Sequence, residues 1–377
     1  MKIGIDASRY KIDTPTGVEW YSYYLLNALI PVLGRDHEME VRLYTQKPTR
    51  FEEELPFNVK ERVIPQLKFW TLLRLSWELL TRPVDLLFVP SHILPLWLPQ
   101  KTVVTVHDIA FKIPGFRSAY DAKNKFLLEW STRRAVKKAY KIIVPSQATK
   151  EDLVKYFQCK PEKITVIYHG GPDISGENNP ALKKWSDEEK KTILKRIGLT
   201  EKDLVALYVG RVEFKKNIVN LLEAFNRVIK EYPDWKLVLA GKEGQGYEEI
   251  EAKIAELGLE HNVVLPGYVT DLEKRFLLNK CRVFVFPSKY EGFGLPILEA
   301  FAYRRPVLTS NISSMPEVAG QAAFLVNPDK IEEISVGLKR LISDGVLISR
   351  LVSAGEKQLE KFSWEKSAAE TFDVLSG

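Results

Sequence analysis

Cysteine and histidine are scarce in this chain. Its 377 residues include two cysteines, Cys159 and Cys281, and five histidines. Two cysteines so far apart in the sequence exclude a disulfide framework, and such low usage is typical of a reducing compartment. The same scarcity argues against a dedicated zinc site. We therefore expect a cytoplasmic protein with no bound metal.

Long uninterrupted apolar runs are also missing. The N-terminal MKIGIDASRY has one lysine followed by an alternating, strand-like run, so it predicts no signal peptide. The longest apolar stretch, Leu86–Pro99, contains three prolines, a serine and a histidine. These residues are incompatible with a membrane-spanning helix, which needs ~20 apolar residues in succession.

Two glycine-rich fingerprints are absent. No G-x-G-x-x-G follows the first expected strand, and the glycines of GKEGQG (Gly241–Gly246) have the wrong spacing. No G-x-x-x-x-G-K-[ST] occurs anywhere in the chain. The chain thus lacks the main sequence motifs of the dinucleotide-dependent dehydrogenases and of the P-loop nucleotide hydrolases.

Positive charge is concentrated in the first half of the chain. The formal net charge is +6, and residues 1–175 hold 26 Lys and Arg against 19 Asp and Glu, while the remainder holds 29 against 30. A basic half indicates an anionic partner or an anionic membrane surface. An ordinary solvated surface explains the same excess. We expect no nucleic-acid partner.

Short apolar strands alternate with amphipathic helices from end to end, which predicts parallel sheets covered by helices on both faces. Twelve or more strands are too many for one such sheet. The polar stretch 169–184 has the composition of a linker. We therefore predict an α/β protein of two doubly wound, Rossmann-like domains rather than a TIM barrel. Ligands of such sheets bind beyond the carboxyl ends of the strands.

The segment Phe284–Asn311 is the richest in candidate site residues. A buried strand is followed by the loop KYEGFG and by a helix that is expected to begin near Leu295. The loop glycines let backbone amides approach a ligand, and the helix N-terminus is a ready anion site. Glu291 and Glu299 can accept hydrogen bonds from hydroxyl groups there. On spacing alone, however, a turn residue and a surface charge are the simpler interpretation.

Two other segments place polar side chains at strand ends. Arg211 and Lys216 straddle the start of a helix, where two cations can clamp a diphosphate. His107 and Asp108 close another strand. Exposed cations are usually solvated, and a histidine is more often packed and hydrogen-bonded than functional. Each of these signals is therefore weak by itself.

Together, these segments resemble the retaining glycosyltransferases of family 4, which have the GT-B fold. The resemblance is carried by YVGRVEFKKNI, PGYVTD, FVFPSKYEGFGLPILEA, TSNISSMPEV and FSWEKSA, in that order over the second half of the chain. MKIGIDA, TGVEWY, RLSWELL, VTVHD and VPSQATKEDL extend it more loosely over the first half. Within the family, the chain looks most like the bacterial and archaeal mannosyltransferase-like branch.

The resemblance implies a role for each motif residue of the second half. Arg211 and Lys216 would hold the donor diphosphate and stabilise it as the leaving group. Glu291 would lie near the transferred sugar, and Glu299 would bind the ribose hydroxyls. The other implied donor-binding residues are Gly292, Phe293, Gly294 and Leu295 in the loop over sugar and phosphate, and Tyr268 and Val269 beside the base.

In the first half, the resemblance implies that His107 is a catalytic residue near the donor sugar. It would stabilise the developing oxocarbenium ion through its backbone carbonyl, or bond the 6-hydroxyl of the sugar. Gly17 would lie in the loop over the diphosphate. The family often has two adjacent glycines there, whereas this chain has Thr16 before Gly17, so the path of the loop is open.

The resemblance also implies that the two domains bind different substrates. An acceptor-binding domain over residues 1–175 would face a nucleotide-sugar-binding domain over 176–362 across a cleft. A last helix over 363–377 would cross back to the first domain. The sequence FSWEKSAAETFDVL offers an apolar stripe at helical spacing for that contact, made of Trp364, Ala368, Phe372 and Leu375.

The implied activity is that of a retaining, metal-independent hexosyltransferase that needs no cofactor. Its donor would be GDP-mannose, and its acceptor a glycan or a lipid-linked sugar. We expect front-face transfer assisted by the leaving phosphate oxygen, rather than a nucleophilic Glu291. The alternatives are a UDP-glucose-dependent glucosyltransferase, a GT-B-type sugar-nucleotide epimerase and a non-catalytic nucleotide-sugar-binding protein. A binding protein is expected to have lost Lys216 or Glu291, and an epimerase lacks the spacing of the two glutamates.

Two basic, aromatic segments of the first half suit a peripheral contact with the inner face of the cell membrane. They are Leu67–Leu80, with two tryptophans, and Arg117–Lys141, in which six cations between residues 123 and 138 accompany Phe126 and Trp130. A basic helix with an apolar face can lie in an anionic membrane interface. The preferred expectation is that these helices simply cover the sheet and bury their aromatic side chains.

Overall fold

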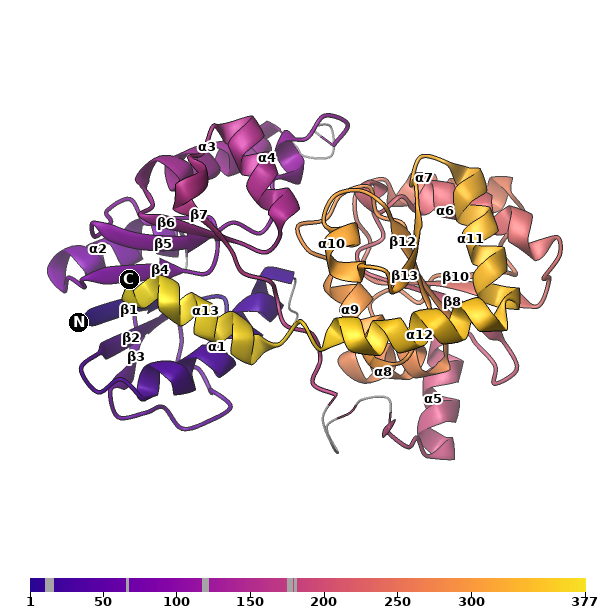
Figure 1. Ribbon diagram of the computed structural model, residues 1–377, viewed down its shortest axis with the longest axis horizontal. Coiled ribbons are helices and arrows are strands. Elements are labelled where there is room, and N and C mark those ends of the chain that lie inside the picture. Colours follow the sequence, from indigo (N-terminus) through magenta and orange to yellow (C-terminus); the bar gives the residue numbers. More distant parts are fainter. Residues whose placement is uncertain (11–16, 66–67, 117–121, 175–178, 180–181) are drawn as a thin grey trace. The chain divides into compact units, whose positions relative to one another are not determined.

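The computed structural model describes residues 1–10, 17–65, 68–116, 122–174, 179 and 182–377. It consists of two compact units (Figure 1). Unit 1 comprises Met1–Gly170 and Phe362–Gly377, and unit 2 comprises Gly171–Lys361. The boundary between the two units after Gly170 therefore falls five residues before the expected domain boundary at residue 175. Within the described residues, no helix is both long and apolar enough to cross a membrane.

Unit 1 is built on a seven-stranded parallel sheet in the order β3-β2-β1-β4-β5-β6-β7. The strands are β1 Lys2–Asp6, β2 Glu40–Thr45, β3 Val59–Val63, β4 Leu86–Val89, β5 Lys101–Thr105, β6 Lys141–Val144 and β7 Ile164–Val166. The α-helices are α1 Gly17–Gly34, α2 Leu75–Thr81, α3 Ala122–Lys138, α4 Gln147–Phe157 and α13 Trp364–Ser376. Shorter helical turns are η1 Trp70–Arg74, η2 Ala110–Lys112 and η4 Pro161–Lys163.

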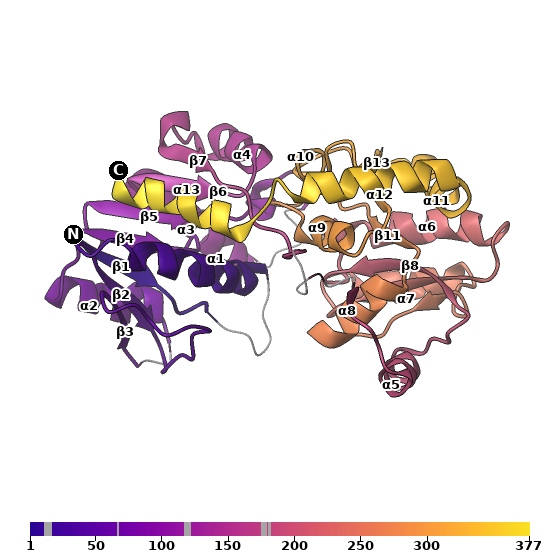
Figure 2. The same cartoon turned by 60° about the horizontal axis from the view of Figure 1, so that its bottom comes forward.

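Two hydrophobic layers cover the sheet of unit 1. On one face, Leu25 and Leu29 of α1 share a core with strand residues and with Ala368 and Leu375 of α13. Helices α1 and α13 accordingly lie side by side (Figure 2). The opposite face packs against η1, α2, α3 and α4, with Leu79 fully buried there. The chain's last helix is therefore an integral part of unit 1.

Unit 2 is built on a six-stranded parallel sheet in the order β10-β9-β8-β11-β12-β13. The strands are β8 Leu204–Val209, β9 Trp235–Ala240, β10 Val263–Val264, β11 Val283–Phe286, β12 Val307–Ser310 and β13 Ala323–Val326. The helices are α5 Asp187–Ile197, η7 Phe214–Lys216, α6 Ile218–Ile229, α7 Tyr247–Glu256, α8 Asp271–Lys280, α9 Leu295–Ala302, α10 Met315–Ala319, α11 Ile331–Ser343 and α12 Gly345–Leu359. Both strand orders reverse direction once, so the predicted pair of doubly wound sheets is confirmed.

The sequence patterns missed one strand. Strand β3, with the sequence VKERV, pairs with β2 at the edge of the sheet of unit 1. Its three successive charged residues hide the apolar alternation that marks a strand. A charged edge strand is a common way to protect an open sheet edge from further pairing. The helix expected within Leu67–Leu80 also differs, because it begins with the π-helical turn η1 before α2.

Candidate functional site

The sheet of unit 2 changes direction between β8 and β11, and the candidate site lies where these two strands end. Their carboxyl ends lead into residues 210–217 and 287–294, respectively. The two loops touch, since the backbone N–H of Lys289 donates to the carbonyl of Lys215 at 3.0 Å. Such a reversal point is where ligands of open parallel sheets bind.

Lys216 and Glu291 form an ion pair across these loops. The ammonium lies 2.5 Å from Oε1 of Glu291, and the two side chains are only 11% and 13% exposed. The hydroxyl of Ser288 donates to the same carboxylate oxygen at 2.7 Å. The ammonium also lies 5.8 Å from the centre of the Phe286 ring. An ammonium has three N–H donors, so contact with one carboxylate oxygen leaves donors for an anionic ligand.

Two serines hold the glycine loop after β11. The hydroxyl of Ser314 donates to the carbonyls of Phe293 at 2.6 Å and Glu291 at 3.0 Å, and that of Ser313 donates to Glu291 O at 2.8 Å. Phe293 is buried, and Gly294 adopts φ +119° as the residue that precedes α9. The serines thus satisfy two carbonyls of the loop, which leads into the first turn of α9, and the N-terminal turn of a helix is a favourable place for an anion. Sequence reasoning assigned no role to the serine pair.

Glu299 is tied to a different lysine. Its carboxylate lies 2.6 Å from the ammonium of Lys274, and the two side chains are 24% and 20% exposed. Lys274 belongs to the first turn of α8, where Thr270 and Glu273 form a reciprocal capping box. The T-x-x-E pattern was a readable sign of that helix start, but the Lys274–Glu299 contact was not predicted. The two carboxylates that sequence placed at one edge thus have separate cationic partners.

Arg211 follows β8 and is exposed, unlike Lys216. The phenol of Tyr208 donates to its backbone carbonyl at 2.8 Å, and burial raises the pKa of that phenol. The side chain of Arg211 passes close to the backbone of Gly244. A Cβ added at residue 244 would lie only 2.8 Å from Cγ of Arg211. The loop 241–246, which had no assigned role, therefore shapes the path of Arg211.

Tyr268 and Val269 lie between β10 and α8. The ring of Tyr268 is 45% exposed, and the ammonium of Lys242 lies 4.8 Å from its centre. Val269 is buried. An exposed aromatic ring beside a lysine can pack against a planar, electron-rich group. Of this pair, Tyr268 is the residue that a ligand can reach.

In unit 1, His107 follows β5 and belongs to a group of three histidines, of which His169 is buried and His92 and His107 are partly buried. Its Nε2 lies 3.0 Å from the carbonyl oxygen of Pro90, which must accept, so Nε2 carries the proton. Its ring is 4.6 Å from Tyr21 and 5.8 Å from His169. His92, after β4, is the third member, and sequence reasoning missed both His92 and His169. Gly17 is the first residue of α1, with open space around its Cβ position, while Thr16 lies outside the described residues.

Burial keeps these three histidines neutral. It lowers the pKa of His92 from 6.5 to about 4, and it lowers the pKa of His107 and of His169 as well. Histidines in the unfolded chain bind a proton below about pH 6.5, whereas His92 in the folded chain does so only near pH 4.

Because the unfolded chain binds more protons in this window, the free energy of unfolding should decrease as the pH falls from about 6.5 to 4. His92→Gln should make this decrease less steep, and the exposed His37→Gln is the matched control. Urea unfolding at a series of pH values measures the slope. An unchanged slope in His92→Gln would show that His92 does not contribute to the pH dependence of the free energy of unfolding.

Comparisons with known proteins agree with this architecture. A family model described as Glycosyltransferase Family 4 matches residues 15–171, and one described as Glycosyl transferases group 1 matches residues 189–358. O-antigen chain mannosyltransferase B of Escherichia coli is 29% identical over 308 residues, which are 80% of this chain and 76% of that protein. The serotype-specific mannosyltransferase WbdA of Escherichia coli is 29% identical over 282 residues, 72% of this chain and 33% of that protein.

Two solved structures show the same fold. Sucrose-phosphate synthase from Thermosynechococcus elongatus superposes with a TM-score of 0.73 at 18% identity, covering 99% of this chain and 98% of that one. Alr3699/HepE of Anabaena, in complex with UDP and glucose, gives a TM-score of 0.71 at 18% identity, over 100% and 99% of the two chains. Together with the family matches, these structures confirm the predicted GT-B fold class.

Proposed function

The chain belongs to the family 4 glycosyltransferases, and we propose that it is a retaining hexosyltransferase that moves mannose from GDP-mannose to a glycan or lipid-linked acceptor. The observation that carries the proposal is the buried Lys216–Glu291 pair beside the glycine loop at the reversal point of the sheet. A buried cation next to first-turn helix amides is suited to a diphosphate. The mannosyltransferases among the relatives support the choice of sugar.

In this proposal the cations act on the leaving group. The bond between the sugar C1 and the diphosphate oxygen breaks, and the acceptor oxygen bonds to C1 from the same face. The acceptor's proton passes to the departing phosphate oxygen. Negative charge grows on the diphosphate while the C1–O bond breaks, next to Lys216, Arg211 and the first turn of α9. Fixed positive groups at the place where charge develops lower the barrier most. Catalysis by these side chains requires no divalent metal.

The remaining side chains position the substrates. Glu299 would accept hydrogen bonds from the ribose hydroxyls in exchange for part of its contact with Lys274. Tyr268 would lie against the base, with buried Val269 supporting its loop. Glu291 would contact the transferred sugar while it holds Lys216. In unit 1, His107 would be a catalytic residue, and this unit would bind the acceptor.

Donor choice is testable by ligand-induced stabilisation. GDP-mannose at saturating concentration should raise the melting temperature and support turnover more than UDP-glucose does, because only the bound folded state gains free energy. The assay is a thermal-shift panel of nucleotide sugars, followed by product formation with and without EDTA. EDTA should leave turnover unchanged.

A UDP-sugar that alone stabilises the protein would overturn the choice of GDP-mannose and favour the glucosyltransferase alternative. The Anabaena structure with UDP and glucose makes that alternative the second candidate. Loss of activity in EDTA would overturn metal independence.

We also propose a cytoplasmic location with a peripheral contact at the inner face of the cell membrane. Both cysteines are buried and not disulfide-bonded, which fits a reducing compartment. A lipid-linked acceptor would lie at such a surface.

A further inference from the structure

The segment formed by η1 and α2 exposes one complete apolar stripe. Phe69, Leu73, Trp77 and Leu80 recur on successive turns, and each is more than half exposed. Different residues pack on the sheet: Trp70, Leu75 and Leu79 are buried. The helix therefore already has the apolar face that covering the sheet requires. The expectation that both tryptophans are buried is correct for Trp70 and wrong for Trp77.

Phe69 is held outward by an unusual backbone. It adopts φ +53° and ψ +34°, a left-handed conformation that is disfavoured for a bulky aromatic residue. The next residue, Trp70, is anchored by a hydrogen bond from its Nε1 to the carbonyl of Ile64 at 2.7 Å. The chain thus keeps a strained turn that leaves Phe69 67% exposed. Strain of this kind concentrates at functional surfaces.

Hydrogen bonds connect η1 to α3 through the loop after β4. The backbone N–H of Leu96 donates to Leu72 O at 3.1 Å, which joins the loop after β4 to η1. The guanidinium of Arg134 in α3 donates to Leu96 O at 2.6 Å and lies 5.9 Å from the centre of the Trp130 ring. Five exposed aromatic side chains of these segments define what we call the aromatic face: Phe69, Trp77, Trp97, Phe126 and Trp130.

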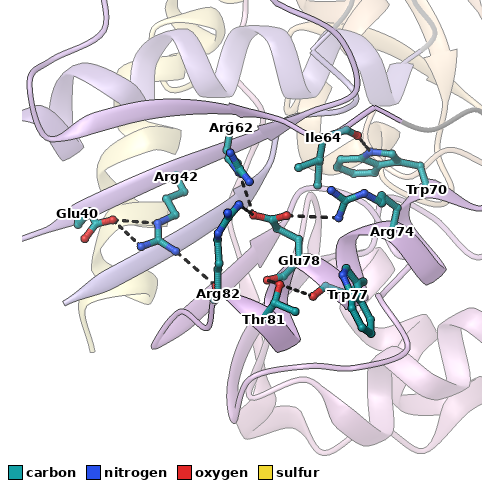
Figure 3. Close-up of polar contacts among 10 residues, drawn as sticks. All are labelled: Glu40, Arg42, Arg62, Ile64, Trp70, Arg74, Trp77, Glu78, Thr81 and Arg82. Carbon is teal, nitrogen blue, oxygen red and sulfur yellow. Dashed lines mark hydrogen bonds and ion pairs between the residues drawn. The ribbon is translucent and has the colours of Figure 1, made fainter.

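Positive charge accompanies the aromatic face. Three guanidinium groups surround the single buried carboxylate of Glu78, from Arg62 at 2.9 Å, Arg74 at 3.3 Å and Arg82 at 3.1 Å (Figure 3). One carboxylate neutralises only one of the three, so this cluster carries two net positive charges. Helix α3 has six Lys and Arg residues and one glutamate. Helices α2 and α3 both contribute to the hydrophobic core on this side of the sheet.

We propose that the aromatic face docks on the interface of an anionic lipid bilayer. Aromatic side chains partition into the interface while lysine and arginine meet the anionic headgroups. This combination favours a bilayer over a second copy of the chain, because two copies would bring like charges together. The inference deepens the membrane location in the proposed function, and it depends on neither the donor nor the reaction.

Co-sedimentation with vesicles tests the inference without any substrate. The wild-type protein should bind vesicles of phosphatidylcholine and phosphatidylglycerol at low salt, bind less as salt rises, and bind pure phosphatidylcholine weakly. Phe69→Asn with Trp77→Gln should weaken binding by about tenfold or more at every salt concentration, because two buried aromatic groups are lost. Asparagine tolerates the left-handed backbone at residue 69.

A second double variant tests the contribution of positive charge to vesicle binding. Lys123→Gln with Lys137→Gln should weaken binding about tenfold at low salt and little at high salt. Phe57→Ser is the matched control, because Phe57 is 69% exposed in the β2–β3 connection, outside the aromatic face. It should bind like the wild type. Stabilisation by donor, measured on every variant, should stay at the wild-type value and separates this inference from the proposed function.

Three results would overturn the inference. The first is absence of vesicle binding by the wild type at low salt. The second is wild-type binding by the Phe69→Asn, Trp77→Gln variant. The third is a wild-type dimer in sedimentation equilibrium that this variant dissociates without any change in vesicle binding, which would make the face a protein interface.

Discussion

Lys216→Ala should reduce kcat by ~10²–10³-fold while changing the affinity for the donor much less. The ammonium of Lys216 is fixed by Glu291 in a largely buried position. A preorganised donor in such a place acts mainly on charge that develops during bond cleavage, so its loss falls on the transition state. Steady-state kinetics with the preferred nucleotide sugar, together with donor binding by thermal shift, measure the two effects separately.

Lys215→Ala is the matched control for this experiment. Lys215 belongs to the same turn but contacts Glu213 at 3.5 Å, so its loss should change turnover about twofold at most. The double variant Lys216→Ala with Glu291→Gln removes the carboxylate that the single variant leaves without its partner. If turnover recovers in the double variant, the lysine only neutralises Glu291, and its role toward the diphosphate is wrong. A rise in KM with unchanged kcat would contradict the transition-state role.

Gly241→Ala should destabilise the protein by ~2–5 kcal/mol and lower activity as well. Gly241 directly follows β9 and has φ +156°, and a Cβ there would lie 1.8 Å from the carbonyl oxygen of Gly210. Overpacking against rigid backbone and an unfavourable φ each contribute to the loss. The same Cβ would lie 3.4 Å from the backbone nitrogen of Arg211. Chemical unfolding and turnover measure the two consequences.

Gly246→Ala is the control that separates the cost of a positive φ from the cost of a steric contact with neighbouring backbone. Gly246 has φ +80° in the same loop, but the nearest atom to its Cβ position is 3.5 Å away. This control should lose only about 1–2 kcal/mol, the cost of a left-handed alanine. Equal losses in the two variants would show that the contact between Gly241 and Gly210 contributes nothing.

The sequence by itself determined the fold class and the family motifs that contain the proposed donor-site residues. Short apolar strands such as 204–209 and amphipathic helices such as 147–157 were readable because periodicity is a local property. The motifs around Arg211 and Glu291 identified the family for the same reason. Strand β3 and the serines that hold the glycine loop were missed, because charged edge residues and hydroxyls carry no periodic signal.

Only the tertiary structure decided which side chains meet and which apolar faces stay uncovered. Lys216 and Glu291 are 75 residues apart, and they meet because β8 and β11 are neighbours in the sheet. Phe69 and Trp77 read as core residues in the sequence, yet they lie exposed, since the sheet is already covered by Trp70, Leu75 and Leu79. Periodicity shows that a face is apolar, but what covers that face depends on segments distant in the chain, which come together only when the whole sheet has assembled.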